Sequence, residues 1–589
     1  MFPSQRAAAP PTSRPQPARG GLSPRASERL AIVLLCAFVL VVYAPALDIP
    51  FLGDDYVFLD KTRSARFVDL WSFANTNFGW YRPWSREFHF WLLQRLVGTN
   101  EAAFRAVSLL LWLGGLGGYL LVLREFLSRR AALLATLGTA ALALWAAPLL
   151  WISGSQDLWM VALAMLALLL FARRHEGWAL LPYALALLSK ETAAVLPLVA
   201  VGHAWIVSGD RFQSAFRRTL PLILLTVTWF LVHPVLRQRL GGHAGARFGA
   251  EPHPPGAMIA IQTVLSVLNA SALSRPVDWN VFAPLRTALA TALLVAAAAL
   301  ALQLPRAKPS PSLAGNHSTR ALRFGAWWAA AGWLPLFQAS IGWHAYYGCL
   351  GAMGAWVALG ERLARRRALA LPAIALIGIL QGVSGATRAW DWGSEWYQRR
   401  AGNLLGLIRR QLLAQHPTLP HHARLYFGNI PNNIGLVAGQ SPAVRSWYGD
   451  STLQAGFYSY YEPRSGREPQ GPDLFFRFDT TMGLTEVRTG PEDVALASRA
   501  DAGWEDAHRK LAVLFVSHGN FRAAAEEFEK VALLPGRPEA LMFAAVSRER
   551  CGEPSAADSL FRLAAERSGR RSAEIAAWAA KLRATIPHR

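Results

Sequence analysis

Two adjacent acids, Asp54 and Asp55 in the string FLGDDYVFLD, follow the first hydrophobic run of the chain by a few residues. One carboxylate of such a pair can accept a proton from an incoming hydroxyl, while its neighbour holds a metal ion or a basic group. At a bilayer surface this chemistry suits a lipid-anchored substrate, because base and reacting bond then meet at the same depth. The pair therefore predicts a general base, and the alternative is acids that only keep an external loop soluble.

A third acid, Asp157 in WISGSQDLW, lies between two later hydrophobic runs. It is either the N-cap of a helix, where Asp is favoured, or a carboxylate that faces Asp54 and Asp55 across a cavity. In the second case a divalent ion could bridge the acids and a phosphate, which makes Asp55 and Asp157 candidate metal ligands.

Basic and aromatic residues supply candidate phosphate contacts. Arg82, in YRPW, either holds a phosphate oxygen with its planar fork or pairs with the acids. Lys190 and Glu191 interrupt an apolar stretch, where ionised groups are costly unless they pair or contact a polar substrate. His344, in WHAYY with Tyr347, is a candidate phosphate or metal ligand, and the alternative is an interfacial aromatic belt.

Long hydrophobic runs must position these residues. The chain has 589 residues, 53% of them hydrophobic, which is typical of a polytopic membrane protein. The pattern predicts a mainly helical bundle of about eleven spans, each near the length that a tilted helix needs. They are residues 30–47, 103–123, 132–150, 157–172, 177–189, 192–207, 219–236, 284–303, 324–340, 345–361 and 368–385. An alternative for the first run is a signal peptide ending near Ala44-Pro45-Ala46.

The formal charge of +22 follows the topology of the spans. Arginine clusters fall in alternate connections between spans, as the positive-inside rule requires. The pattern therefore predicts a multi-pass protein of the cytoplasmic (inner) membrane with its N-terminus in the cytoplasm. The first loop and everything after residue 386 are then predicted to lie outside. Because no basic stripe with interleaved aromatics occurs outside the membrane, nucleic acid is not an expected partner.

Four regions follow from these patterns. Residues 1–28 are predicted to be a disordered cytoplasmic tail. Residues 29–385 form the membrane domain, with a first external loop at 48–102 in which 85–97 is an interfacial helix. A second apolar stretch, 256–273, is a candidate interfacial helix. Residues 386–495 are predicted to form a small extracytoplasmic mixed α/β domain, helical over 386–424 and then strand-forming.

Residues 504–589 are predicted to be helical repeats. Two segments align at a spacing of 33 residues, with Gly519 over Gly552 and Phe528 over Phe561, and a final helix follows at 572–584. The pattern resembles the tetratricopeptide repeat, in which Gly allows the turn and the aromatic fills the groove between helices. The repeats either bind a protein partner or cap the preceding domain.

The order of a first span, GDDY, YRPW, SGSQDL, LLSKETAAVLPL and a late aromatic span resembles the GT-C glycosyltransferase superfamily. Within it, the chain is similar to bacterial relatives of protein O-mannosyltransferases and of the TMTC glycosyltransferases that carry tetratricopeptide repeats. The resemblance implies transfer of a sugar from a polyprenyl-phosphate donor to an acceptor outside the membrane, the acceptor being protein, lipid or polysaccharide. It maps the first-loop acids to Asp54 and Asp55, the second-loop acid to Asp157 and a late polar position to His344. The possible divalent metal differs between branches.

Two other classes of function stay open. A transporter or flippase would also place polar groups within its spans, and a non-catalytic scaffold would use its repeats to hold partners. The classes differ in geometry. Convergence of Asp54, Asp157 and Lys190 on one external cavity favours the enzyme, whereas scattered placement favours a scaffold.

Overall fold

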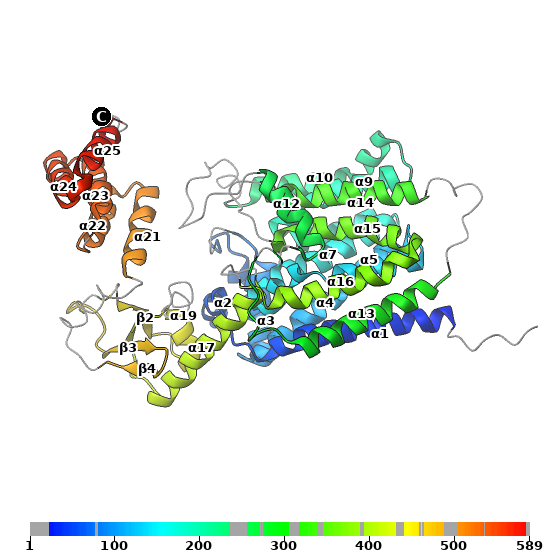
Figure 1. Cartoon of the computed structure of the whole chain (residues 1–589), viewed down its shortest axis with the longest axis horizontal. Helices are drawn as coiled ribbons and strands as arrows, with labels where there is room; N and C mark the ends of the chain where they lie inside the picture. Colours follow the sequence, from blue (N-terminus) through cyan, green and yellow to red (C-terminus); the bar gives the residue numbers. More distant parts are fainter. Residues whose placement is uncertain are drawn as a thin grey trace, which may run out of the picture.

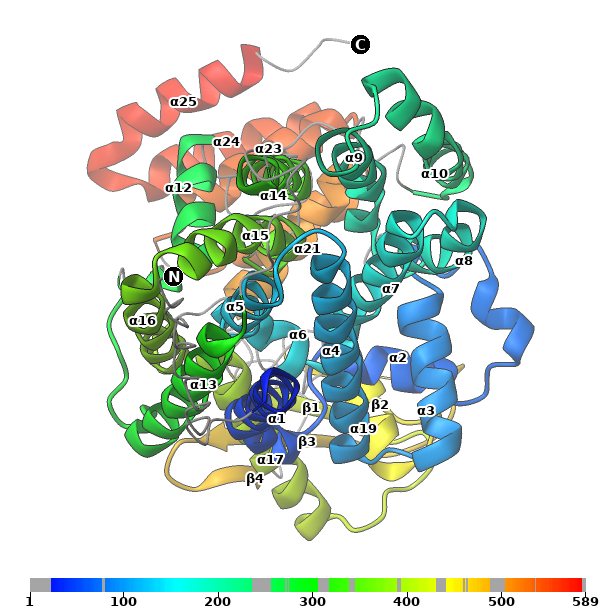
Figure 2. The ribbon, with the colours of Figure 1, turned by 90° about the vertical axis from the view of Figure 1, so that its right-hand side faces the viewer.

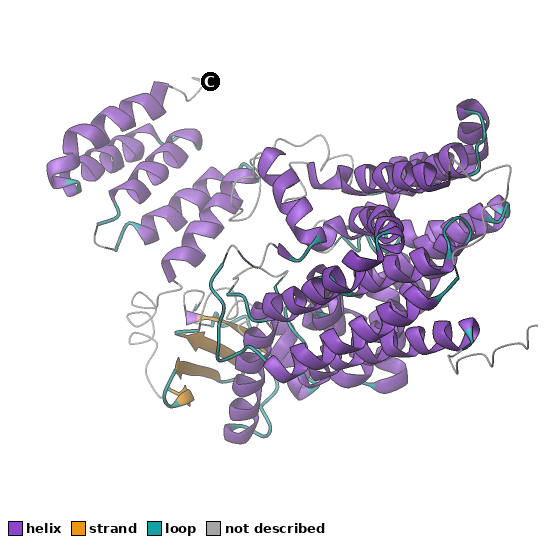
Figure 3. Ribbon diagram, turned by 45° about the vertical axis from the view of Figure 1, so that its right-hand side comes forward, coloured by secondary structure: helices purple, strands orange, loops and turns teal. Residues whose placement is uncertain are grey.

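The computed structural model describes residues 23–76, 80–235, 256–270, 273, 275–305, 317–337, 345–388, 394–430, 441–458, 461, 464–487, 504–534 and 536–584. Long helices lie roughly side by side in one bundle, and a small sheet lies at one end of it (Figure 1). Figure 3 shows this separation of a helical part from the strands. The mainly helical class predicted from the sequence is confirmed.

The first half of the bundle begins with α1 and ends with α10. Its elements are α1 (Pro24–Tyr43), η1 (Ala44–Asp48), α2 (Asp54–Thr62), η2 (Phe67–Trp71), η4 (Trp84–Phe88), α3 (His89–Val97), α4 (Glu101–Arg124), α5 (Arg129–Ala140), η5 (Ala143–Trp145), α6 (Ala146–Leu150), η6 (Ile152–Gly154), α7 (Ser155–Ala172), α8 (Glu176–Leu187), η7 (Glu191–Val195), α9 (Leu196–Gly202), η8 (His203–Val207) and α10 (Phe212–Val232). The second half contains α12 (Gly256–Val267), α13 (Pro284–Gln303), α14 (His317–Trp333), η10 (Leu334–Phe337), η11 (Ala345–Gly348), α15 (Cys349–Arg365) and α16 (Arg367–Gly385).

Six of the described helices are long and apolar enough to cross a membrane, or seven if the bent pair Arg129–Ala140 and Ala143–Leu150 is one span. The bend in that pair, 55°, falls within the predicted span 132–150. The predicted runs 177–189 and 192–207 form α8 and the shorter pieces η7, α9 and η8. The number of about eleven spans stays a prediction.

The bundle is layered, with close helix contacts in its interior. Helix α15 lies between α14 and α5, and α13 lies between α1 and α16 (Figure 2). Small residues permit the approach of α14 and α15, since a Cβ on Gly354 would lie 2.4 Å from the backbone nitrogen of Ala329. At the opposite end from the sheet, Glu28 of α1 pairs with Arg124 and Arg129, which joins the ends of α1, α4 and α5.

The α/β domain follows the last long helix. It contains α17 (Glu395–Gln415), β1 (Arg424–Gly428), α19 (Ser441–Tyr448), β2 (Gln454–Phe457), β3 (Asp473–Asp479) and β4 (Gly483–Glu486). The strand order is β2-β1-β3-β4; β1 is parallel to β2 and β3, and β4 is antiparallel to β3. Alternate residues of the strands, such as Leu425 and Phe476, belong to the same core as Leu405 of α17 and Val444 of α19.

The C-terminal helices α21 (Trp504–Ser517), α22 (Phe521–Val531), α23 (Pro538–Arg550), α24 (Pro554–Arg567) and α25 (Ser572–Ala584) pack chiefly on one another. Gly519 and Gly552 have positive φ angles, of 73° and 84°, in the turns that precede α22 and α24. These are the turn positions that the alignment of the two segments predicts. The assignment to tetratricopeptide repeats stays a prediction.

Candidate active site

Helix α2 begins with the acid pair and turns its two members in different directions. Gly53, with φ of 53°, allows the sharp turn into the helix. The Asp55 carboxylate then points inward, where it accepts hydrogen bonds from the backbone nitrogen of Ser153 (2.7 Å), the Ser153 hydroxyl (2.5 Å) and the backbone nitrogen of Leu52 (2.8 Å). Burial raises the pKa of Asp55 to about 6, and these donors oppose the rise. Asp55 therefore fastens α2 to the turn before α7.

Asp54 has no such partners. Among the residues that the structure describes, its carboxylate makes no hydrogen bond or ion pair, and it lines a cavity. Burial and the neighbouring charge of Asp55 raise the pKa of Asp54 to about 7, while Arg86 and Arg82 lower it. A carboxylate with a pKa near neutrality, whose oxygens can still accept hydrogen bonds, is suited to take a proton from a substrate.

Arg82 is held from both sides before any ligand binds. Its Nε lies 2.8 Å and its Nη2 2.6 Å from Oε2 of Glu191, and its Nη1 donates to Oε1 of Gln156 at 2.6 Å. Arg82 lines the cavity, whereas Glu191 is not one of the lining residues. Of the two sequence-based interpretations of Arg82, pairing is thus observed, and the pairing fixes where its charge lies.

Lys190 pairs with Asp157, not with the neighbouring Glu191. Its Nζ lies 2.5 Å from Oδ1 of Asp157, and both side chains are almost fully buried. The same ammonium lies 4.3 Å from the ring centre of Tyr347 and 4.8 Å from that of Tyr346, within the range of cation–π attraction. Asp157 lies in the first turn of α7 and lines the cavity. The N-cap of α7 is Gly154, so the interpretation of Asp157 as an N-cap is wrong.

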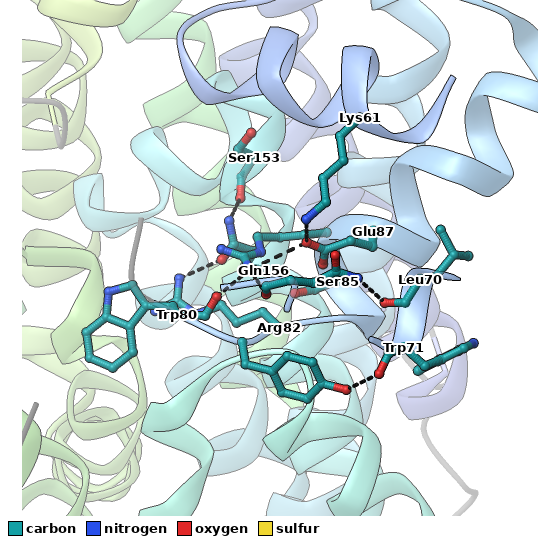
Figure 4. Close-up of polar contacts among 12 residues, drawn as sticks. Lys61, Leu70, Trp71, Trp80, Arg82, Ser85, Glu87, Ser153 and Gln156 are labelled. Carbon is teal, nitrogen blue, oxygen red and sulfur yellow. Dashed lines mark hydrogen bonds and ion pairs between the residues drawn. The ribbon is translucent and has the colours of Figure 1, made fainter. Parts of the chain in front are cut away.

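Arg86 is a site residue that the sequence reasoning missed, because it occurs in a segment interpreted as an interfacial helix. Its Nη2 donates to the Trp80 carbonyl at 2.5 Å, and its guanidinium lies over the Phe58 ring. Figure 4 shows how the first loop is held here, with Lys61 reaching Glu87 and Gln156 donating to the carbonyl of Ser153.

These side chains line one cavity of about 160 Å³. Its walls are Asp54, Phe58, Trp80, Arg82, Arg86, Trp151, Ser153, Gly154, Gln156, Asp157, Lys190, Tyr346 and Tyr347. The lining holds three cationic side chains and two acids, an excess of one positive charge. Such a cavity favours an anionic ligand next to a carboxylate.

The structure brings together Asp54, Arg82, Asp157, Lys190 and Tyr347 among the predicted site residues. Asp55 and Glu191 do not line the cavity but bind the lining residues Ser153 and Arg82. His344 lies outside the described residues. Sequence reasoning did not select Trp80, Arg86, Ser153, Gln156 or Tyr346. The available signal was adjacency, since Ser153 and Gln156 belong to the SGSQDL turn and Tyr346 to the WHAYY string.

A divalent metal does not fit the predicted ligands Asp55 and Asp157. The Asp55 carboxylate already accepts three hydrogen bonds, and Oδ1 of Asp157 is occupied by Lys190. Within the described ranges, no group of three or more His, Cys, Asp or Glu side chains is arranged to hold a metal ion.

No family model matches the chain, and none of the curated proteins matches it. Similar solved structures include arabinofuranosyltransferase AftD from Mycobacteria, with 16% identity, a TM-score of 0.40, and coverage of 74% of this chain and 32% of AftD. ArnT from Cupriavidus metallidurans, bound to undecaprenyl phosphate, has 17% identity, a TM-score of 0.37, and coverage of 76% of this chain and 93% of ArnT.

Archaeal oligosaccharyltransferase AglB from Archaeoglobus fulgidus, in complex with an inhibitory peptide and a dolichol-phosphate, has 10% identity and a TM-score of 0.37. That match covers 73% of this chain and 64% of AglB. The neighbours are glycosyltransferases of the GT-C type, the superfamily that the sequence motifs resemble.

Proposed function

We propose that this chain is a membrane glycosyltransferase that moves a sugar from a polyprenyl-phosphate donor to the hydroxyl of an acceptor on the extracytoplasmic side. The observation that carries the proposal is the Asp54 carboxylate, which makes no hydrogen bond or ion pair with the described residues and lies in a cavity that also presents Arg82, Arg86 and Lys190. Asp54, Asp157 and Lys190 come from three separate elements, and their convergence supports an enzyme over a scaffold.

The acidic and basic side chains of the cavity have different roles in the proposed reaction. Asp54 takes the proton of the acceptor hydroxyl, whose oxygen forms a bond to the anomeric carbon of the sugar. The bond from that carbon to the phosphate oxygen breaks, and its electron pair leaves with the polyprenyl phosphate. The guanidinium groups of Arg82 and Arg86 and the ammonium of Lys190 stabilise the charge that develops on the phosphate.

The shape of the site matches one part of a large donor. Whole ligands usually occupy pockets of roughly 300–1,000 Å³, and this cavity of about 160 Å³ is smaller. It therefore fits the junction of phosphate and sugar, and the lipid tail extends beyond it along the helices. Trp80 and Trp151 in the wall offer flat apolar surfaces to the sugar ring.

The test is transfer from a polyprenyl-phosphate sugar in vesicles that contain the purified full-length chain. We expect turnover by the wild type and loss of about 100-fold or more with Asp54→Asn, the range of general-base catalysis. Asp48→Asn is the matched control, because Asp48 is exposed and lies outside this cavity. Equal turnover of the Asp54→Asn variant and the wild type would exclude Asp54 as the base.

A further inference from the structure

Helix α2 faces the cavity on one side and the α/β domain on the other. Residues 54 and 58 lie about one helical turn apart and both line the cavity, whereas residues 56 and 60 lie on the opposite side of the helix. That opposite side packs against α19 of the α/β domain. Helix α2, which carries the candidate base, is therefore held on the side away from the cavity by α19, a segment almost 400 residues later in the chain.

Two polar contacts join α2 to α19. The indole nitrogen of Trp447 donates a hydrogen bond to the Tyr56 hydroxyl at 2.9 Å, and the two rings meet edge to face at 5.9 Å. Nη1 of Arg445 lies 3.1 Å from Oδ2 of Asp60. Because α2 has only nine residues, contacts at its third and seventh positions, Tyr56 and Asp60, fix both its rotation and its tilt.

The α19 side of this junction is itself anchored. Nε of Arg445 donates to the carbonyl of Leu453, which precedes β2, and the Tyr448 hydroxyl donates to the carbonyl of His416 after α17. The α17 helix in turn packs against the segment before α2, since a Cβ on Gly402 would lie 2.5 Å from the Ile49 side chain. The α/β domain thus holds α2 on its outer face and at its entry.

We propose that Trp447 and Arg445 are positioning residues for Asp54, so that the α/β domain sets the orientation of the helix that carries the base. This inference rests on the proposed function. Neither side chain lines the cavity, and both act through the orientation of α2. A small rotation of α2 moves the Asp54 carboxylate relative to the bound phosphate and hydroxyl, and misplacement of about 1 Å can cost 100-fold in rate.

The first test is a double-mutant cycle with Trp447→Phe and Tyr56→Phe in the full-length chain. Each change removes the hydrogen bond and keeps an aromatic ring. We expect each single variant to lower kcat about tenfold with little change in KM for the donor, and the double variant to lose no more than either single. Thr485→Val is the control, because it removes a hydrogen bond of the α/β domain, from Thr485 to the carbonyl of Arg477, that reaches neither α19 nor α2.

The second test is a charge exchange. Arg445→Asp and Asp60→Arg should each lower kcat, and the two together should recover a large part of it, because the ion pair re-forms in reverse. Recovery would not occur if Arg445 only stabilised the α/β domain. Multiplicative effects in the Trp447 and Tyr56 cycle, together with no recovery in the exchange, would overturn the proposal.

Hydrogen exchange of the α2 amides separates this inference from the proposed function. We expect faster exchange over residues 56–62 in Trp447→Phe and Tyr56→Phe, and unchanged exchange in Thr485→Val. If the wild type transfers no sugar, the proposed function fails, and this measurement still reports whether α19 holds α2. Unchanged α2 exchange in all three variants would refute the positioning role even where transfer is observed.

Discussion

Replacing Asp54 with Asn should remove activity and at the same time stabilise the protein at alkaline pH. The pKa of Asp54 is raised to about 7 from an ordinary value of 3.8. Stability from such a group is full below the unfolded pKa and is lost as the pH rises through the folded pKa. The wild type should therefore lose stability between pH 4 and pH 7 through this residue, whereas the variant should not.

The magnitude follows from the two pKa values. The difference between 3.8 and about 7 corresponds to about 4 kcal/mol of unfolding free energy at a pH well above 7. Because the carboxylate faces a cavity that water can enter, we expect about half of this, near 2 kcal/mol. At pH 4 the two proteins should differ by about 0.5 kcal/mol or less.

The assay is thermal or denaturant unfolding of the detergent-solubilised chain at pH 4, 6 and 8, followed by intrinsic tryptophan fluorescence, with transfer activity measured in parallel. Asp48→Asn should change neither quantity, since Asp48 is exposed. An Asp54→Asn variant that is less stable than the wild type at pH 8 would show that the carboxylate is favourably paired. The reasoning about an unpartnered base would then be refuted.

Three further outcomes are expected. Lys190→Met should lower the unfolding free energy by about 3–5 kcal/mol, because it leaves the buried Asp157 uncompensated, and adding Asp157→Asn should restore stability without activity. Arg82→Lys should lower turnover at least about tenfold, because an ammonium cannot keep the forked contact with Glu191 and the bond to Gln156 together; steady-state kinetics with the donor check this. Deletion of residues 504–589 should leave donor binding and the unfolding temperature of the membrane part unchanged, since α21–α25 pack chiefly on one another; a fall in either would favour a cap over a binding surface.

The sequence predicted elements well where a local pattern determines them. Long apolar runs gave α1, α4 and α13, and the final helix was expected at 572–584, where α25 lies. The strings ARLYFGNIP, LFFRFD and GLTEVRTG predict strands, and they contain β1, most of β3 and β4. Strand β2, with the sequence QAGF, was missed because Gly and Ala carry almost no strand propensity and its pairing with β1 supplies the order.

The partners within the site could not be predicted from local patterns. Lys190 stands beside Glu191 in the sequence, yet its partner is Asp157, and Glu191 instead binds Arg82. The extended backbone of Lys190, with φ of −161° and ψ of 140°, turns the two neighbouring side chains to different sides. Such pairs depend on distances across the bundle, and the packing of the helices sets those distances. A single sequence does not show this packing directly.

Asp54 and Asp55 pose the same problem over a shorter distance. Successive residues of a helix point about 100° apart, so only one member of the pair can face the cavity. Which one does so depends on the turn at Gly53 and on the donors of Ser153. Composition and spacing therefore identify the pair as a candidate, and the three-dimensional structure distinguishes Asp55, which fastens α2, from Asp54, which faces the cavity.

The charge of the cavity links donor binding to the ionisation of the base. Arg82 and Arg86 lower the pKa of Asp54 against the effects of burial and of Asp55. A bound phosphate cancels part of that positive charge, so the pKa of Asp54 should be higher in the complex than in the free enzyme. Since kcat reports the complex and kcat/KM the free enzyme, the acid limb of kcat should lie at higher pH than the acid limb of kcat/KM for the donor. Coincident limbs, or a limb of kcat at lower pH, would mean that the phosphate does not bind beside Asp54.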